Sequence, residues 1–348
     1  MAQNATTNQL VTDKLVTDVL ATIDRERERE IVARRFGLFD RKETLEQIGE
    51  MLGITRERVR QLEKSVVAKL KTSAEQGKLP HIADFQAKVL ELLEAAGQVA
   101  RVSELAKQLS DEPNREEQAR VAFLSQLAPK LAVVNEDDNF YNSVSIKASY
   151  DEKALKDAVG KLIDAVKQLG EPKSIEAVAK ADSIDDPKQA AALASTSKKL
   201  ATLNGRWGLV KWPMVNPKNI RDKIYVILKE NGKQMHFNDI AGAIKDSDFK
   251  RKDVTTQAIH NELIKDKRFV LIGRGIYALK EWGYEKGTVA DVIAQVLTEA
   301  GEPLHRDEIV KRVLKSRFVK ETTILLNLQG KPQFKRVAKA TYTLADAE

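Results

Sequence analysis

Residues 44–70, TLEQIGEMLGITRERVRQLEKSVVAKL, constrain the fold of this chain more than any other stretch. Thr44 and Gln47 have the spacing of a capping box, which predicts the start of a helix. Gly53 predicts a turn after that helix, and Thr55 is placed to cap a second helix. The stretch therefore predicts two helices joined by a tight turn, the helix-turn-helix arrangement.

The apolar residues of this stretch are spaced so that they share one face. In the second helix they recur close to i, i+3, i+7 and i+11, which predicts a single buried stripe. Gly49 is small at the point where the second helix has to cross the first. The residues expected to face inward are Ile48, Leu52, Ile54, Val59 and Leu62, with Val66 and Leu70 continuing the stripe.

The opposite face of the second helix carries polar side chains that suit a major groove. Arg56 can bind guanine, Glu57 can accept from cytosine, and Gln61 can bind adenine. Arg60 can hold a phosphate. The alternative is a solvated helix face with internal ion pairs, because alternating charge along a helix is common.

Residues 27–38, RERE-IVARRFGL, together with TLEQIG and ITRERVRQLEKSVVAKL, closely resemble region 4 of housekeeping-type bacterial sigma factors. The resemblance covers residues 10–72. It implies a domain that reads the minus-35 promoter element and sits on the flap of RNA polymerase. It assigns base contacts to Arg56, Glu57 and Gln61. The expected contacts to the DNA backbone are Arg35, Thr44, Leu45 and Arg60, to which Arg58 and Lys64 are added.

Two departures from the sigma factor pattern matter for function. The loop between Gly37 and Thr44 is slightly shorter than usual. In addition, no region 2 or region 3 precedes the matching segment. We therefore expect that the chain is not an autonomous sigma factor.

A repeat follows the helix-turn-helix stretch, and each copy begins at a glycine. The four copies are GQVARVSELA at Gly97, GEPKSIEAVA at Gly170, GKQMHFNDIA at Gly232 and GEPLHRDEIV at Gly301. An apolar helical pattern precedes every glycine, and an aliphatic residue stands eight positions after it. Each copy ends in a short β-like passage, and two of these passages carry hairpin signals. This order predicts a winged helix.

The expected fold is mainly α, with an N-terminal helix-turn-helix domain and then about four small winged-helix (α+β) domains. The expected boundaries are a disordered tail at 1–9, the helix-turn-helix domain at 10–72, a linker at 73–80, and winged-helix-like domains at 81–148, 150–212, 218–282 and 286–346.

The last two copies, VILKENGKQMHFNDIAGAI with GRGIYAL and VLTEAGEPLHRDEIVKRV with ATYTL, resemble the HARE-type winged helix. That family includes the amino-terminal domain of the RNA polymerase delta subunit and modules attached to restriction and chromatin proteins. The resemblance implies a DNA- or polymerase-associated module without catalytic residues.

The charge of the repeats differs along the chain. Residues 218–280 hold 14 basic side chains against 8 acidic ones, whereas residues 81–149 hold 7 against 11. Because phosphate binding depends on such surpluses, we expect the third copy to contact DNA and the first to face protein, with the fourth copy as a further candidate for DNA contact. The alternative is that the charges of the third copy only keep it soluble. The candidate contacts in that copy are Lys250, Arg251, Lys252 and Arg274.

The sequence offers no support for catalysis, metal binding or a membrane segment. It has no Cys, which excludes disulfides, thiolate zinc sites and Cys nucleophiles. His236 and His305 occupy the repeat position held by Ser174, which indicates helix capping and not metal binding. No phosphate-binding loop or nucleophile elbow is present. We expect no enzyme activity, cofactor, metal or small-molecule substrate, and a cytoplasmic, nucleoid-associated location.

The favoured function is a bacterial transcription regulator that binds promoter-like double-stranded DNA, RNA polymerase, or both. Its formal net charge of +7 agrees with a polyanionic partner. The main alternative is a polymerase-associated subunit or sigma decoy whose surfaces bind only protein. A third hypothesis is that the chain is the DNA-binding part of a restriction or modification system, but no nuclease motif supports it.

Overall fold

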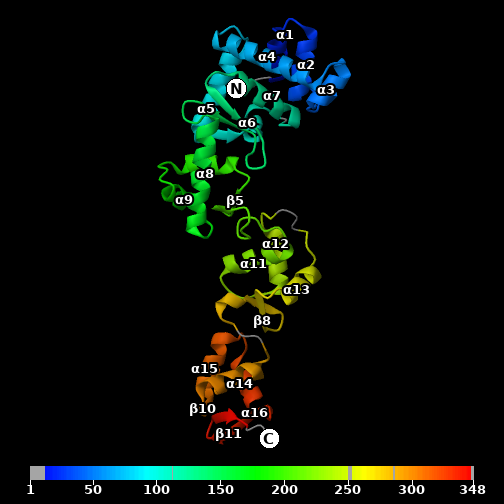
Figure 1. Ribbon diagram of the computed structural model, residues 1–348. Coiled ribbons are helices and arrows are strands. Elements are labelled where there is room, and N and C mark those ends of the chain that lie inside the picture. Colours follow the sequence, from blue (N-terminus) through cyan, green and yellow to red (C-terminus); the bar gives the residue numbers. More distant parts are fainter. Residues whose placement is uncertain (1–11, 112, 250–252, 285–286, 346–348) are drawn as a thin grey trace, which may run out of the picture. The chain divides into compact units, whose positions relative to one another are not determined.

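The structure is a computed structural model that describes residues 12–111, 113–249, 253–284 and 287–345. The tail expected at 1–9 and the candidate contacts Lys250, Arg251 and Lys252 lie outside the described residues. The chain divides into two compact units, Met1–Lys211 and Trp212–Glu348, here called the N-terminal and the C-terminal unit. The described parts are mainly helical and contain small antiparallel sheets of three strands (Figure 1).

The N-terminal unit begins with four helices. The second ends where Gly37 adopts a left-handed conformation with φ 70°, and its amide donates to the carbonyl groups of Ala33 and Arg34. A break near Ile23 and Asp24 separates the first helix from the second. The bounds are α1 (Thr12–Ala21), α2 (Glu26–Phe36), α3 (Leu45–Leu52) and α4 (Arg56–Glu75).

Four α+β segments follow, here called repeats 1 to 4. Each has the order helix, strand, helix, helix, strand, strand, and in each sheet the third strand lies between the first and the second. Repeat 1 consists of α5 (Ile82–Ala96), β1 (Val99–Arg101), α6 (Val102–Leu109), α7 (Arg115–Leu127), β2 (Leu131–Val134) and β3 (Ser143–Ile146). Repeat 2 consists of α8 (Glu152–Leu169), β4 (Lys173–Ser174), α9 (Ile175–Ala181), α10 (Pro187–Thr196), β5 (Leu200–Leu203) and β6 (Arg206–Leu209).

The C-terminal unit contains repeats 3 and 4. Repeat 3 consists of α11 (Ile220–Asn231), β7 (Met235–His236), α12 (Phe237–Asp246), α13 (Thr256–Lys265), β8 (Phe269–Gly273) and β9 (Ile276–Leu279), followed by the 3-10 helix η1 (Lys280–Trp282). Repeat 4 consists of α14 (Val289–Ala300), β10 (Leu304–His305), α15 (Arg306–Ser316), α16 (Glu321–Gly330), β11 (Phe334–Ala338) and β12 (Thr341–Leu344).

The four repeats share two features at corresponding positions. A glycine ends the first helix, and an aliphatic residue of the second helix is buried. The glycine of each copy follows the first helix and has a positive φ, which a side chain would strain. The aliphatic residue eight positions later is at most 1% exposed, as expected for a residue of the repeat core. These residues are Leu105, Val178, Ile240 and Ile309. The side chains of His236 and His305 accept from backbone amides at the starts of α12 and α15, which confirms the capping role.

One hydrophobic core continues from the first helices into repeat 1. It includes residues of α1, α4, α5, α6 and α7. The ring centroids of Phe36 and Phe123 lie 4.9 Å apart, and Arg120 Nε donates to the carbonyl of Leu38 at 2.7 Å. The segment expected as a linker at 73–80 includes the last turn of α4 and the buried Leu79. The third helix of repeat 1, α7, is therefore packed against the helices that precede it.

Repeat 2 packs on repeat 1 through its own third helix, α10. A Cβ atom on Gly97 would lie 2.8 Å from the carbonyl oxygen of Lys188, so only glycine allows this close approach. Arg101 Nε of β1 donates to the carbonyl of Ser195 in α10. The third helices of both N-terminal repeats thus serve as internal packing surfaces.

Within the described ranges, no helix combines the length and the apolar character that crossing a bilayer requires.

Candidate nucleic-acid interface

Helices α3 and α4 form the predicted helix-turn-helix. The Thr44 side chain accepts from the amide of Gln47, and the Gln47 side chain accepts from the amide of Thr44, which confirms the capping box. Gly53 ends α3 with φ 62°, and Thr55 accepts from the amide of Arg58 to start α4. The two helices therefore begin at fixed positions relative to the turn.

Gly49 lets the two helices meet closely. A Cβ atom at this position would lie 2.7 Å from the carbonyl oxygen of Ile54, which belongs to the turn backbone and cannot easily move aside. Any larger residue would push α3 away from the turn.

A small core lies beneath the turn. Ile31 of α2, Ile48 of α3 and Val59 of α4 are fully buried together. Arg27 of α2 also donates to the carbonyl of Leu52 at 2.6 Å, which ties α2 to the end of α3. The residues that complete this core are half-buried: Leu45, Leu52, Ile54 and Leu62. This confirms the predicted inward face of the helix-turn-helix.

The polar face of α4 is open to solvent, opposite Val59. Arg56, Glu57 and Gln61 are all exposed, and they lie on the first two turns of the helix. An exposed N-terminal part of the second helix is the part that reads base edges in helix-turn-helix proteins. The residues expected at the backbone on the same helix, Arg58, Arg60 and Lys64, are exposed as well.

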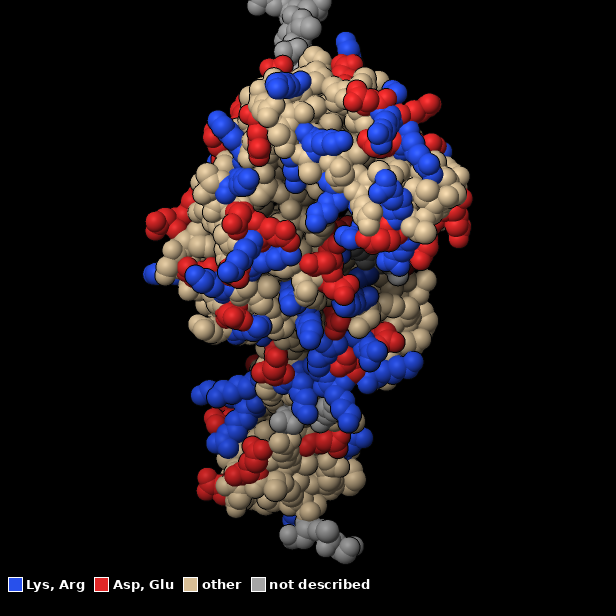
Figure 2. Space-filling view, turned by 45° about the horizontal axis from the view of Figure 1, so that its top comes forward, with Lys and Arg blue, Asp and Glu red and all other residues tan. Residues whose placement is uncertain are grey.

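The side chains of this face are paired with one another. Glu57 accepts from Arg60 through both carboxylate oxygens at 2.8 and 2.7 Å, and from Gln61 at 3.3 Å. Arg56 lies 3.5 Å from Glu46 of α3. Figure 2 shows similar mixing on a larger scale, since basic and acidic side chains are interspersed over much of the face that is drawn. To bind a phosphate, Arg56 or Arg60 would therefore have to exchange a carboxylate partner for it.

The hydrogen bonds from Arg60 lower the pKa of the Glu57 carboxyl to about 2. Because this pKa lies below the usual value of 4.5, the pair contributes stability above about pH 4.5 and loses it as the pH falls toward 2. Arg60→Ala is expected to return the pKa of Glu57 toward 4.5. An NMR titration of the Glu57 carboxyl carbon measures this, with Lys69→Ala on the same helix as the control. An unchanged pKa in Arg60→Ala would show that another group holds Glu57 ionised.

The remaining expected backbone contacts surround the start of α3. Arg35 is half-buried, with Nε 3.4 Å from Glu63 and Nη1 donating to the carbonyl of Glu43 at 3.2 Å. The Thr44 oxygen already accepts from Gln47, so its hydroxyl proton is what it can offer to a phosphate. Leu45 is half-buried in the small core and exposes only part of its surface. The structure thus brings these residues to one edge of the helix-turn-helix.

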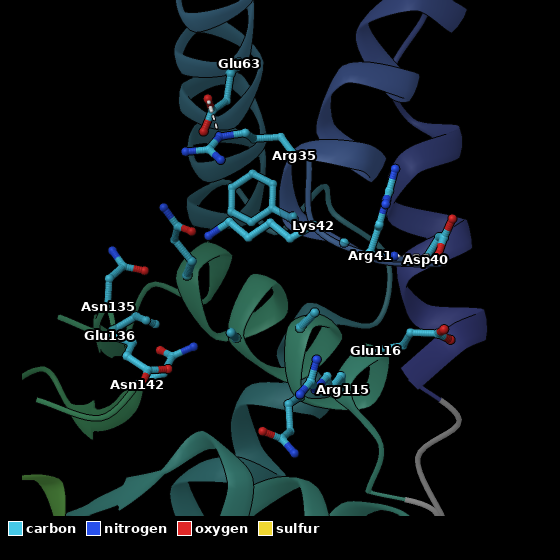
Figure 3. A pocket seen from close by; sticks show the side chains of 17 residues that line it. Arg35, Asp40, Arg41, Lys42, Glu63, Arg115, Glu116, Asn135, Glu136 and Asn142 are labelled. Atoms are coloured by element: carbon cyan, nitrogen blue, oxygen red, sulfur yellow. Dashed lines mark hydrogen bonds and ion pairs between the residues drawn. The ribbon is translucent and has the colours of Figure 1, made fainter. Parts of the chain in front are cut away.

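A cleft of about 970 Å³ separates this edge from α7 (Figure 3). Arg35 and Glu63 lie on one side of it, and Arg115 and Glu116 of α7 lie on the other. Partial burial, and then the nearby Arg35, lower the pKa of Lys42. The cleft has both signs of charge, so it does not form a phosphate-binding surface by itself. Sequence reasoning missed it because it exists only where repeat 1 docks on the first helices.

Arg274, the candidate wing contact, lies far along the chain from this interface. It is exposed in the turn between β8 and β9 of repeat 3. Because it belongs to the C-terminal unit, it is a separate candidate from the helix-turn-helix.

Comparisons with known proteins place the helix-turn-helix in a family. Residues 25–72 match the family described as "Sigma-70, region 4", a DNA-binding helix-turn-helix module that contacts promoter DNA and RNA polymerase. This range contains every candidate residue of α3, α4 and the loop before them. It begins later than the expected residue 10, so it leaves out α1, which in this chain packs against α7.

Curated relatives of this segment are sigma factors. The chain is 51% identical over 57 residues to the RNA polymerase sigma factor sigB of Arabidopsis thaliana, which covers 16% of the chain and 9% of the relative. It is 39% identical over 69 residues to RpoD of Helicobacter pylori (19% and 10%) and 49% identical over 55 residues to SigA of a Bacillus species (16% and 14%). The matching segment thus spans 9 to 14% of these relatives.

Proposed function

We propose that this chain is a sequence-specific transcription regulator that reads promoter-like double-stranded DNA with residues 44–64. The observation that carries this proposal is the exposed start of α4, where Glu57 and Gln61 stand opposite the fully buried Val59 and Arg56 is exposed at the first helical position. A rigid core under an exposed row of base-reading side chains is what a major-groove helix requires.

The roles within this interface follow from side-chain chemistry. Arg56 binds the acceptor edge of guanine, Glu57 accepts from cytosine, and Gln61 binds adenine. Arg35, Arg58, Arg60 and Lys64 hold phosphates on either side, and the Thr44 hydroxyl and the Leu45 amide approach the backbone at the start of α3. The contacts to phosphates and to the DNA backbone orient the helix but do not read the base sequence.

The four repeats are the second part of the proposal. Their shared element order and sheet topology support winged-helix domains. The HARE type proposed for repeats 3 and 4 rests on their sequence resemblance alone. We propose that the four repeats form the second arm of the chain, which regulates RNA polymerase and does not act as an autonomous initiation factor. Transcription by core polymerase with this chain as the only added factor should give no promoter-directed product.

A protein-only role is the second candidate. The observation that favours it is that acids already neutralise the cations of the face: Arg56 faces Glu46, Arg60 faces Glu57 and Arg35 faces Glu63. In that case the chain binds RNA polymerase as an accessory subunit or sigma decoy and selects no DNA sequence.

Selection from a random duplex library by the full chain separates the two candidates. The wild type is expected to enrich a short motif, and Arg56→Ala or Gln61→Ala to lose preference at one position each, by about 1 to 3 kcal/mol. Lys69→Ala, an exposed change farther along α4, should leave the motif intact. If the folded wild type enriches nothing but still captures polymerase, the protein-only role is the correct one.

A further inference from the structure

The third helix of a repeat can enter a DNA groove only if the chain itself leaves it uncovered. In repeat 1, Val121, Phe123 and Leu124 of α7 are fully buried, and α7 packs against α1, α2 and α4. In repeat 2, α10 packs on β1, and Ala190, Leu193 and Ala194 are at most 1% exposed. Neither helix of the N-terminal unit can reach DNA without breaking these interfaces.

Repeat 4 exposes its third helix but lacks the chemistry for phosphate. α16 has the sequence ETTILLNLQG and carries no Lys or Arg. Its exposed positions include Glu321, Thr322 and Leu326, and the Leu326 side chain is 68% exposed. A face that carries an acid and no Lys or Arg is unfavourable next to a polyanion.

Repeat 3 presents a different surface on α13. Gln257, Asn261, Ile264 and Lys265 are exposed at positions i, i+4, i+7 and i+8, so they share one side of the helix. Gln257 Nε2 donates to Asn261 Oδ1 at 3.1 Å, which places the two amides side by side. The Ile264 side chain is 64% exposed.

The acids close to this face are engaged elsewhere. Glu262, the acid within α13, pairs with Arg221 at 3.1 Å, and Asp266 at its end pairs with Arg268 at 2.7 Å. Exposed cations stand nearby in the sequence of the same repeat: Lys265, Lys267 and Arg274 at the tip of the β8–β9 turn. The local balance therefore favours an anionic partner.

We propose that α13 is a second DNA-reading helix, which binds a major groove rich in A·T pairs. Glutamine and asparagine amides match the donor and acceptor edge of adenine, and an exposed aliphatic side chain contacts the methyl group of thymine. Lys265 and Arg274 hold the flanking phosphates. This site rests on the proposed DNA-binding function, and it adds a second DNA contact that is separate from the helix-turn-helix.

The test uses the full chain and a random duplex library with a site long enough for two contacts. The wild type should enrich a second, A·T-rich element beside the motif read by α4. Gln257→Ala with Asn261→Ala should lose preference for that element by about 5- to 150-fold. Lys265→Ala with Arg274→Ala should weaken binding to all sequences and reduce the slope of log affinity against log salt by about 0.9 for each lost phosphate contact.

Repeat 4 supplies the matched control. Thr322 and Leu326 occupy the positions of α16 that correspond to Gln257 and Asn261, because both helices begin at the same point of the repeat. Thr322→Ala with Leu326→Ala should change neither the motif nor the salt dependence. Far-UV circular dichroism of all variants checks that they fold, and every change concerns an exposed side chain.

The outcomes separate this site from the helix-turn-helix. Arg56→Ala should alter only the first element, and the α13 double variant only the second. A wild-type selection without an A·T-rich element, or one that the α13 variant still enriches, would overturn the second site even if the first motif is intact. An equal loss from the α16 control would do so too.

Discussion

Val59→Asp is expected to unfold the helix-turn-helix and to remove both specific and non-specific DNA binding by this domain. Val59 is fully buried with Ile31 and Ile48, and the aliphatic side chains of this core cannot pair with a carboxylate. Burying an unpaired charge there should cost more than about 4 kcal/mol, which is enough to unfold a helix-turn-helix that depends on this small core.

Amide hydrogen exchange and a gel-shift measurement check this result. The amides of α3 and the first turns of α4 should lose protection, while those of repeats 2 to 4 keep theirs. Arg56→Ala is the matched control on the same helix, because its side chain is exposed and its loss should change sequence preference without unfolding. A protected, DNA-binding Val59→Asp chain would mean that the small core does not hold the domain together.

The helix-turn-helix could be predicted from the sequence because its signals are local. The capping box of Thr44 and Gln47, the turn at Gly53 and the inward Ile48 and Val59 lie within a few residues of one another. Each of these features depends on residues close to it in the sequence, so it can be predicted without knowing any distant contact. The resemblance to sigma region 4 depends on the same local spacing, and the family comparison confirms it over residues 25–72.

The repeat pattern also appeared in the sequence, because each copy ends its first helix at a glycine and buries an aliphatic residue eight positions later. What the sequence could not show is how the copies use their third helices. The helices α7 and α10 pack inside the N-terminal unit, and α13 and α16 present polar or exposed faces. Whether a third helix is buried or exposed depends on shape complementarity between segments that are far apart in the chain.

A signal for this difference was nevertheless present. The stretch RVAFLSQL in α7 places apolar residues on more than one side of the helix, as does AAALA in α10. A helix with two apolar sides needs two partners, and one repeat supplies only one of them. The acidic charge of repeat 1 led us to expect that it faces protein. The surface that α7 meets belongs to α1, α2 and α4 of the same chain.

The buried apolar residues of α4 also show that sequence spacing does not identify packing partners. Val59 and Val66 were expected on one buried face, and both are buried. They enter different cores, however, since Val59 lies under the turn and Val66 lies in the core shared with repeat 1. Helical spacing identifies which side is buried but not which partner buries it.

Phe123→Ala tests whether that shared core couples the two parts. The Phe123 side chain is fully buried between α2 and repeat 1, and its loss should lower the free energy of unfolding of the N-terminal unit by about 3 to 5 kcal/mol. For a unit of this size the melting temperature should fall on the order of 10 °C. Differential scanning calorimetry measures both quantities, with Phe39→Ala as the control because that ring is 45% exposed.

The same variant decides whether DNA binding by α4 depends on repeat 1. Because Phe36 of α2 rests on Phe123 and Val66 of α4 lies in the same core, the cavity should lower hydrogen-exchange protection in α2 and α4 as well as in repeat 1. Loss of protection confined to repeat 1 would contradict a shared core. If both parts lose it together, α4 is held in place by a repeat whose own third helix is buried against the first helices.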